Sequence, residues 1–267
     1  MTRLRYAFAD SLVVAQRNVI KIRRVPEVLV FVLLSPIMFV LLFGFVFGNA
    51  IEVEGTSYRE FLIAGIFAQT VMFGATFTGA GLAEDMQKGI MNRFRSLPMS
   101  RSAVLAGRTA SDVIYNLISI VVMSLTGLLI GWRIRGSIGD ALLAFALMLV
   151  FAYAISWIMA YIALLVPSVE VINNAAFMVI FPLSFVANTF VPSEDLPGPL
   201  QTFAEWNPVS TVTQAARELF GYIPPEVPEP TAWPLQHPVI YTLGWVVVTI
   251  AVFAPLSIGR YRKAAVR

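Results

Sequence analysis

The side chains that could perform acid–base, nucleophilic or metal chemistry are few, and their spacing matches no catalytic motif. The 267 residues include no cysteine and one histidine, His237, which lies beside Pro238. Neither an HExxH zinc motif nor a GxxxxGK(S/T) phosphate-binding loop occurs in the chain. We therefore expect no catalytic residue, no metal site and no cofactor bound by this chain, and we expect His237 to be a solvated loop residue.

The most informative spacing lies in the connection from Glu84 to Arg108. Four apolar residues recur there at steps of four, four and three: Met86, Ile90, Phe94 and Leu97. This pattern predicts a short amphipathic helix that Pro98 terminates. A helix in this position could pass a push from a soluble partner into the membrane. The alternative interpretation is a loop that rests on lipid head groups.

The elements that must position this connection are six stretches without Asp, Glu, Lys, Arg or His, each of 20 or more residues. About 20 apolar residues in a helix span a bilayer core. The composition agrees, because 58% of the residues are hydrophobic and 13% are charged, against about 25% charged in soluble domains. We expect an all-α polytopic membrane protein with six spans, at about residues 28–50, 61–83, 110–132, 141–166, 171–191 and 239–259.

The positive charges predict the orientation. If the spans alternate, 15 of the 19 Lys and Arg residues fall on one side of the membrane, which is the cytoplasmic side by the positive-inside rule. Both termini are then cytoplasmic, and we expect a multi-pass protein of the plasma membrane. The pI near 9.3 reflects contact with acidic membrane lipid rather than with nucleic acid, since the cations are sorted by side.

The first 27 residues have a helical pattern of their own. Apolar residues recur at steps of four and three: Leu4, Phe8, Leu12, Ala15, Val19 and Ile22. Charged residues fall on the opposite face: Arg3, Asp10, Arg17, Lys21 and Arg24. This pattern predicts an amphipathic helix along the inner interface. The alternative is an anchor that only orients the first span.

A second long connection, residues 192–237, is acidic and exterior by the same count. Its apolar stretches are about ten residues long, which is too short to span, and Asn207-Pro208 interrupts them. Such lengths favour a re-entrant helix pair packed against protein. The proline-rich stretch 224–234 that follows predicts a stiff, extended linker. We expect an external cap that could serve as a gate.

The second and fifth spans mix aromatic residues, methionine and uncharged polar groups. Such a mixture suits a large amphipathic ligand, because apolar surface supplies affinity and amides supply orientation. Packing of the core, with satisfied amides, is the alternative. The hypothetical substrate path consists of Gln69, Met72, Phe73, Phe77, Asn174, Phe177, Phe181, Phe185 and Asn188.

Two segments carry a family resemblance. In the first, Glu84-Asp85 is followed by Lys88-Gly89 and then by RFRSLPMSR at 93–101. The second reads FPLSFVANTFVPSEDLP at 181–197 and WNPVSTVTQAAR at 206–217. These segments resemble ABC-2 type permeases, most closely the daunorubicin-resistance branch of drug efflux. The six spans, the cytoplasmic termini and the interfacial N-terminal helix are similar to the layout of that family.

The resemblance implies one type-2 ABC exporter transmembrane domain over residues 1–267. It implies partnership with a second permease, identical or a sister chain, and with two ABC ATP-binding subunits that hold the ATP and Mg. Residues 84–101 would be the coupling helix, with contacts at Glu84, Asp85, Gly89, Arg93, Phe94, Arg95, Leu97, Pro98 and Arg101. The external gate would include Pro192, Glu194, Leu196, Pro197, Asn207, Pro208 and Arg217.

Other functions compete with drug export. The same scaffold could export a lipid-linked glycan or polysaccharide precursor. Half of a secondary transporter or a channel would work without a nucleotide-binding partner, although the lack of charge in the six stretches argues against it. A membrane anchor or assembly factor would leave the structured connection and the external cap without a role.

Overall fold

The computed structural model describes residues 2–24, 26–46, 57–96, 101–166, 168–223 and 228–263, and within these ranges it is helical without a strand. The long helices are α1 Thr2–Arg24, α2 Pro26–Val46, α3 Tyr58–Gln87, α5 Arg101–Leu129, α6 Ile138–Leu165, α7 Val169–Phe185 and α11 Pro238–Lys263. The short ones are α4 Ile90–Ser96, the 3-10 turn η1 Ser193–Asp195, α8 Gly198–Trp206, α9 Pro208–Phe220 and α10 Trp233–Gln236.

Four of the described helices are long and apolar enough to cross a membrane, namely α3, α5, α6 and α11. The apolar helix α7 is shorter, with 17 residues, and α2 has 21 residues. Each of the six expected spans overlaps one of these helices, but six crossings stay a prediction. The largest difference in bounds is in α5, which begins at Arg101 and not near residue 110.

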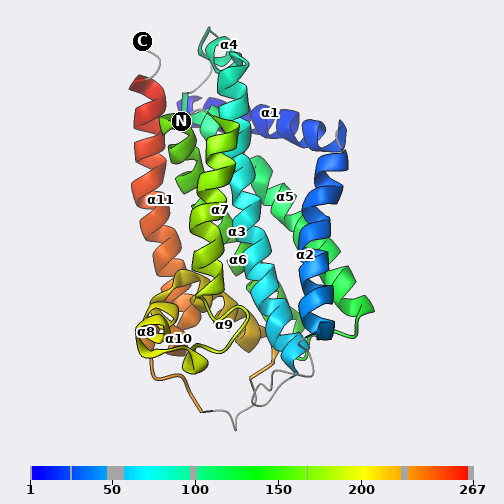
Figure 1. The fold of residues 1–267 in the computed structure, drawn as a ribbon. Helices are drawn as coiled ribbons and strands as arrows, with labels where there is room; N and C mark the ends of the chain where they lie inside the picture. The colour runs from blue at the N-terminus through cyan, green and yellow to red at the C-terminus, as the bar shows by residue number, and fades with distance from the viewer. Residues whose placement is uncertain are drawn as a thin grey trace.

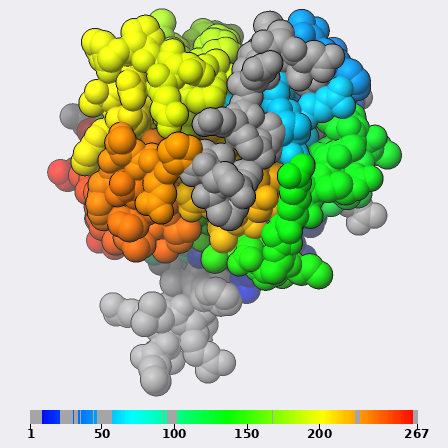
Figure 2. Space-filling model, turned by 90° about the horizontal axis from the view of Figure 1, so that it is seen from below, coloured from blue at the N-terminus to red at the C-terminus, as the bar shows by residue number. Residues whose placement is uncertain are grey.

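Different helices lie at the two ends of the molecule. Both termini, α1 and α4 lie at one end, and α1 runs across the long helices there (Figure 1). Helices α8, α9 and α10 gather at the opposite end, where they form what we call the cap, residues 193–223 and 228–237. Seen from that end, the cap lies on one side of the face, and the α5–α6 connection lies on the other side with parts of α2 and α3 (Figure 2).

Helix α3 is the centre of the packing. In its most apolar stretch 78% of the residues are buried, against 17% for α11. The Ser57 hydroxyl accepts a hydrogen bond from the Glu60 backbone amide and so caps the first turn. Near the cap, Phe67 lies 5.6 Å from both Trp132 and Phe145, measured between ring centroids. This helix therefore contacts the elements at both ends of the molecule.

Residues 84–101, expected as one coupling helix, form separate elements. Helix α3 continues through Gln87. Gly89 then adopts a φ of 67°, which is not helical and therefore interrupts the helix. Glycine suits this position because the conformation is unfavourable for other residues. Helix α4 starts again at Ile90 and has seven residues. Arg101 already belongs to α5, and Leu97 and Pro98 lie outside the described residues.

Candidate functional site

One arginine of α1 connects three elements at the end that holds the termini. Arg17 Nη2 donates a hydrogen bond of 2.5 Å to Asp85 Oδ2 at the last turn of α3. The same guanidinium lies 5.0 Å from the ring centroid of Phe94 in α4, at a cation–π distance. The neighbouring Asn18 donates to Ser111 Oγ of α5 at 3.2 Å. We call these five residues the Arg17 cluster.

Asp85 is the buried member of the ion pair in the Arg17 cluster, so it depends on its partner. The Asp85 side chain is 8% exposed, whereas the Arg17 side chain is 36% exposed. A carboxylate in such a site needs a charged or hydrogen-bonding partner, because its own hydration is lost. Arg17 therefore contacts α4 and the end of α3 from one position on α1.

The other residues expected in the coupling segment surround this cluster. Glu84 pairs with Lys88 across one helical turn at 2.6 Å, on the surface. Arg93 is exposed and Phe94 is partly buried. The side chains of Arg95 and Arg101 lie outside what the structure describes. Asp85 and Phe94 are thus brought to one place, and the residue that joins them, Arg17, was expected only on the charged face of α1.

A polar seam joins α3 to α5. The members on α3 are small and share one face: Gly74, Thr78 and Gly81. Those on α5 are larger and occur every fourth residue: Arg108, Asp112 and Asn116. Thr78 Oγ1 donates a hydrogen bond to Asp112 Oδ2. A Cβ added at Gly74 would meet the Asn116 side chain, and one at Gly81 would meet the Arg108 guanidinium. Each polar side chain of α5 therefore fits against a small residue of α3.

The seam places a buried carboxylate inside a helix that is long enough to span. Asp112 is 3% exposed, and Arg108 lies one turn away on the same helix, with its Nη2 donating to Phe77 O at 2.7 Å. The expected span 110–132 contains Asp112 but not Arg108, and charge-free length, which begins at Val113, gives no reason to pair the two. The four-residue spacing on α5 was the signal that could have found the pair.

At the opposite end, Arg217 anchors α9 of the cap to α3 and to the turn that follows α7. Its guanidinium donates to Phe61 O at 3.1 and 3.2 Å and to Asn188 O at 2.7 Å. Its Cζ lies 3.4 Å from the centroid of the Phe61 ring. Burial lowers the pKa of Arg217 to about 9, so the group stays charged at neutral pH. The carbonyl and ring contacts offset the loss of hydration.

The other expected gate residues form two groups. Asn207 is buried between α8 and α9, where its Nδ2 donates to Leu183 O at 2.8 Å and its Oδ1 accepts from the Val209 amide. Pro208 is the first residue of α9. The remaining residues lie in or beside η1, with Glu194 and Pro197 exposed and Pro192 and Leu196 partly buried. Asn207 and Arg217 are thus anchors of the cap in this structure.

The expected substrate-path residues differ in burial. Gln69, Met72 and Asn188 are buried within the chain, with Gln69 Nε2 donating to Ser184 Oγ at 3.3 Å. Phe77 packs on Tyr115 of α5. The residues toward the outside of α7 include Asn174 and Phe177, both exposed, and Phe181 and Phe185, both partly buried.

An aromatic column connects these outer residues to α2 and α3. The rings in order are Phe73, Phe177, Phe181, Phe185, Phe190, Phe43 and Phe39, with neighbouring centroids 4.2–6.4 Å apart. Phe177 is 58% exposed. The column runs from the exposed Phe177 to the buried Phe190 and the partly buried rings of α2, whereas Gln69 and Met72 do not line an open path here.

Comparisons with known proteins agree on one family. The family model described as ABC-2 type transporter matches residues 11–220. A daunorubicin resistance ABC transporter permease protein of Streptomyces coeruleorubidus is 31% identical, over 92% of this chain and 84% of that protein. A probable doxorubicin resistance ABC transporter permease protein of Mycobacterium tuberculosis is 26% identical, over 86% and 80% of the two chains. A putative transport permease of Pyropia yezoensis is 28% identical, over 78% and 72%.

We expect Arg17→Gln to lower the free energy of unfolding by about 2 kcal/mol, because it leaves the buried Asp85 without its cation. Thermal unfolding of the purified chain in detergent measures this. Gln16→Glu is the matched control, since it changes the charge equally at an exposed neighbouring position. The double variant Arg17→Gln with Asp85→Asn should recover part of the loss. An unfolding temperature equal to that of the control would contradict the role of the pair.

We expect Thr78→Val to lower the free energy of unfolding by about 1–3 kcal/mol, because the buried Asp112 carboxylate loses a donor while the side-chain shape is kept. Thr76→Val is the control, since the Thr76 hydroxyl bonds within its own helix, to Phe73 O at 2.7 Å. Chemical unfolding in mixed micelles gives both values. Equal effects of the two variants would show that the Thr78–Asp112 bond does not hold the seam together.

Proposed function

This chain belongs to the ABC-2 type transporter family, and from that premise we propose that it is the permease subunit of an ATP-driven exporter for amphipathic, drug-like compounds. The observation that carries the proposal is the Arg17 cluster, which ties the seven-residue α4 to α1, α3 and α5. Two relatives that match most of this chain are named as daunorubicin and doxorubicin resistance permease proteins, which supports this class of substrate.

The energy would come from separate ABC ATP-binding subunits, one for each of two permeases. In this proposal α4 contacts the ATPase at the cytoplasmic side, where the termini also lie. The positive-inside bias of the charges supports this orientation, and six helices would cross the plasma membrane. A push on α4 would act on Phe94 and, through Arg17, on α3 and α1. The polar seam would make α5 follow α3.

The second permease would face the aromatic column. The exposed apolar side chains of α7 at the column are Phe177, at 58%, and its neighbour Met178, at 77%. A partner permease on this face would enclose the column between two chains. Aromatic faces and methionine suit flat, amphipathic compounds, because rings stack on them and no fixed charge has to be matched. Movement of the cap, which Arg217 and Asn207 anchor, would open the outer end.

We expect Phe94→Asp to reduce ATP-dependent export by about tenfold or more, because a carboxylate beside Asp85 competes for Arg17 and loosens α4. The measurement is uptake of a fluorescent anthracycline into inverted vesicles that hold the permease with its ATPase subunits. Phe94→Leu is the matched control and should retain export, since it keeps an apolar contact. Equal export by both variants would contradict coupling through this cluster.

The same vesicles without ATPase subunits test the competing class. Export that depends on the ATPase and on ATP agrees with the proposal. Transport that continues without the ATPase, or under an ion gradient alone, would instead identify a carrier or channel. Stimulation of ATP hydrolysis by lipid-linked glycans but not by anthracyclines would move the substrate class to glycan precursors.

We expect Phe181→Ala to raise the KM for an anthracycline several-fold with little change in kcat, because removal of one ring weakens binding along the column by about 1 kcal/mol. Val179→Ala is the control, since Val179 lies on α7 outside the column and is highly exposed. Transport kinetics in proteoliposomes separate the two constants. A fall in kcat without a change in KM would indicate that the column packs the permease pair and does not bind substrate.

A further inference from the structure

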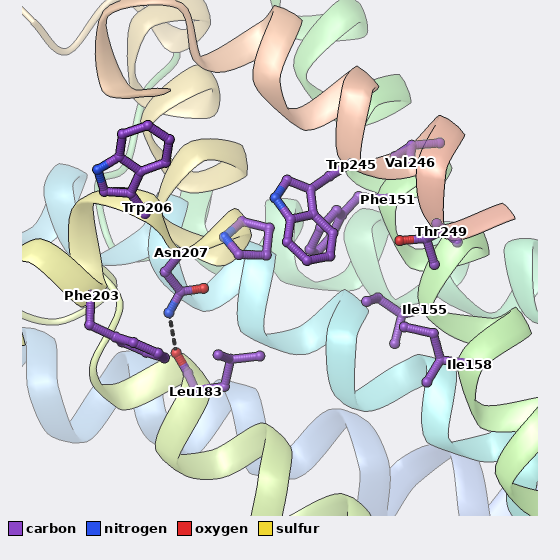
Figure 3. Close-up of a pocket in the computed structure, with 12 residues that line it drawn as sticks. Phe151, Ile155, Ile158, Leu183, Phe203, Trp206, Asn207, Trp245, Val246 and Thr249 are labelled. Atoms are coloured by element: carbon purple, nitrogen blue, oxygen red, sulfur yellow. Dashed lines mark hydrogen bonds between the residues drawn. The ribbon is translucent and has the colours of Figure 1, made fainter. Parts of the chain in front are cut away.

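A lateral cavity of about 340 Å³ lies beneath the cap, between α6, α7, α8 and α11. Aromatic and branched aliphatic side chains form most of its wall, among them Phe151, Ile155, Phe203, Trp206 and Trp245 (Figure 3). The wall carries no charged residue. Such a lining binds hydrocarbon, because it offers apolar contact without a partner for a charge.

The main polar group of the wall is already used by the protein. The Asn207 amide donates to Leu183 O, as the dashed line in Figure 3 shows, and its Oδ1 accepts from the Val209 backbone. Both ends of this amide are therefore engaged in holding α8 and α9 in place. Asn207 is also only 3% exposed, so a polar ligand would find little hydrogen bonding in this wall, whereas an alkyl chain needs none.

The cavity opens toward the side where lipid would be. Two of its walls are α6 and α11, both long and apolar enough to span. Trp245, Phe203 and Trp206 are 41%, 51% and 53% exposed, so the cavity is reached from the outer surface of the helices. The occupant that this surface meets in a bilayer is the acyl region of a phospholipid.

An aromatic cluster at the cap marks the level of the head groups. Tyr241 Oη donates to Trp206 O at 3.0 Å, and the rings of Trp206 and Trp233 both lie 6.2 Å from the Tyr241 ring. Trp and Tyr prefer the membrane–water interface, because each has an apolar body and a polar tip. Trp206 belongs both to this cluster and to the cavity wall, so the cavity begins directly below the interface.

The cavity is separate from the aromatic column. Of the residues of α7, Leu183 lines the cavity, while Phe181 and Phe185 belong to the column. Residues two apart on a helix point about 200° from each other. Leu183 therefore points away from both rings, and α7 separates the two apolar surfaces.

We propose that the lateral cavity binds one acyl chain of a bilayer phospholipid, with the head group beside the cluster of Trp206, Trp233 and Tyr241. The bound chain joins α8 of the cap to α6 and α11, and so stabilises the docked cap. This site does not depend on the proposed transport function, since it needs neither ATP nor a second permease.

The test is photolabelling of the full chain in dioleoyl phosphatidylcholine vesicles that contain a phosphatidylcholine with a diazirine at mid-chain. Mass spectrometry of the labelled peptides should find the label on residues 151–158 of α6 and 245–249 of α11. Ile155→Trp fills the cavity and should reduce this labelling about tenfold. Val150→Trp, on the same helix at a lipid-exposed position outside the cavity wall, should leave it unchanged.

Each outcome decides the proposal. Equal labelling in the two variants, or labelling spread evenly around α6 and α11, would overturn it, because ordinary boundary lipid gives that result. Loss of label on addition of an anthracycline, but not of unlabelled phosphatidylcholine, would also overturn it, since the site would then hold substrate. If Ile155→Trp fails to fold, Thr249→Trp fills the same cavity from α11, and the same loss of label is expected.

Discussion

The interior of a bilayer offers no water to a polar side chain, so the polar groups along α3 depend on partners from other helices. Asp85 meets Arg17 at one end, Thr78 meets Asp112 near the middle, and Phe61 O receives Arg217 at the other end. These contacts lie on one helix of 30 residues, about 45 Å long at 1.5 Å per residue. The Arg17 cluster and the cap therefore contact the same helix at its two ends.

This arrangement explains why the two ends differ in construction. At the end that holds α4, the cation Arg17 is partly exposed and its partners come from three helices, so its geometry can change without exposing an apolar core. Around Arg217 the guanidinium is buried and fixed by carbonyl groups, which favours a permanent joint. In the proposed exporter, the Arg17 contacts suit a joint that rearranges when the ATPase moves α4. The Arg217 contacts suit a cap that moves together with α3.

Much of the helical layout could be predicted from the sequence, because charge-free length and helical periodicity are local properties. The missing details are non-local. The long α5 includes Arg108, which lies outside the expected span 110–132, and Asp112, which precedes the charge-free stretch, and each is accommodated by a small residue of α3. The break at Gly89 follows from one backbone conformation that a 3.6-residue pattern does not register. Arg17 is on the charged face of α1 as expected, but its partners are 68 and 77 residues away.

The contacts of the expected gate residues could not be predicted for the same reason. The family resemblance implied that Asn207 and Arg217 belong to an external gate, and that role stays a prediction. Their partners, Leu183 O and Phe61 O, are backbone atoms, and a backbone acceptor leaves no signature in the sequence. Since both residues hold the cap to the long helices, a gate at this end cannot open by separating the cap from α3 and α7 unless a buried cation loses its acceptors. Movement of the cap together with α3 and α7 avoids that cost, so in the proposed exporter a path would open between two permeases, along the aromatic column.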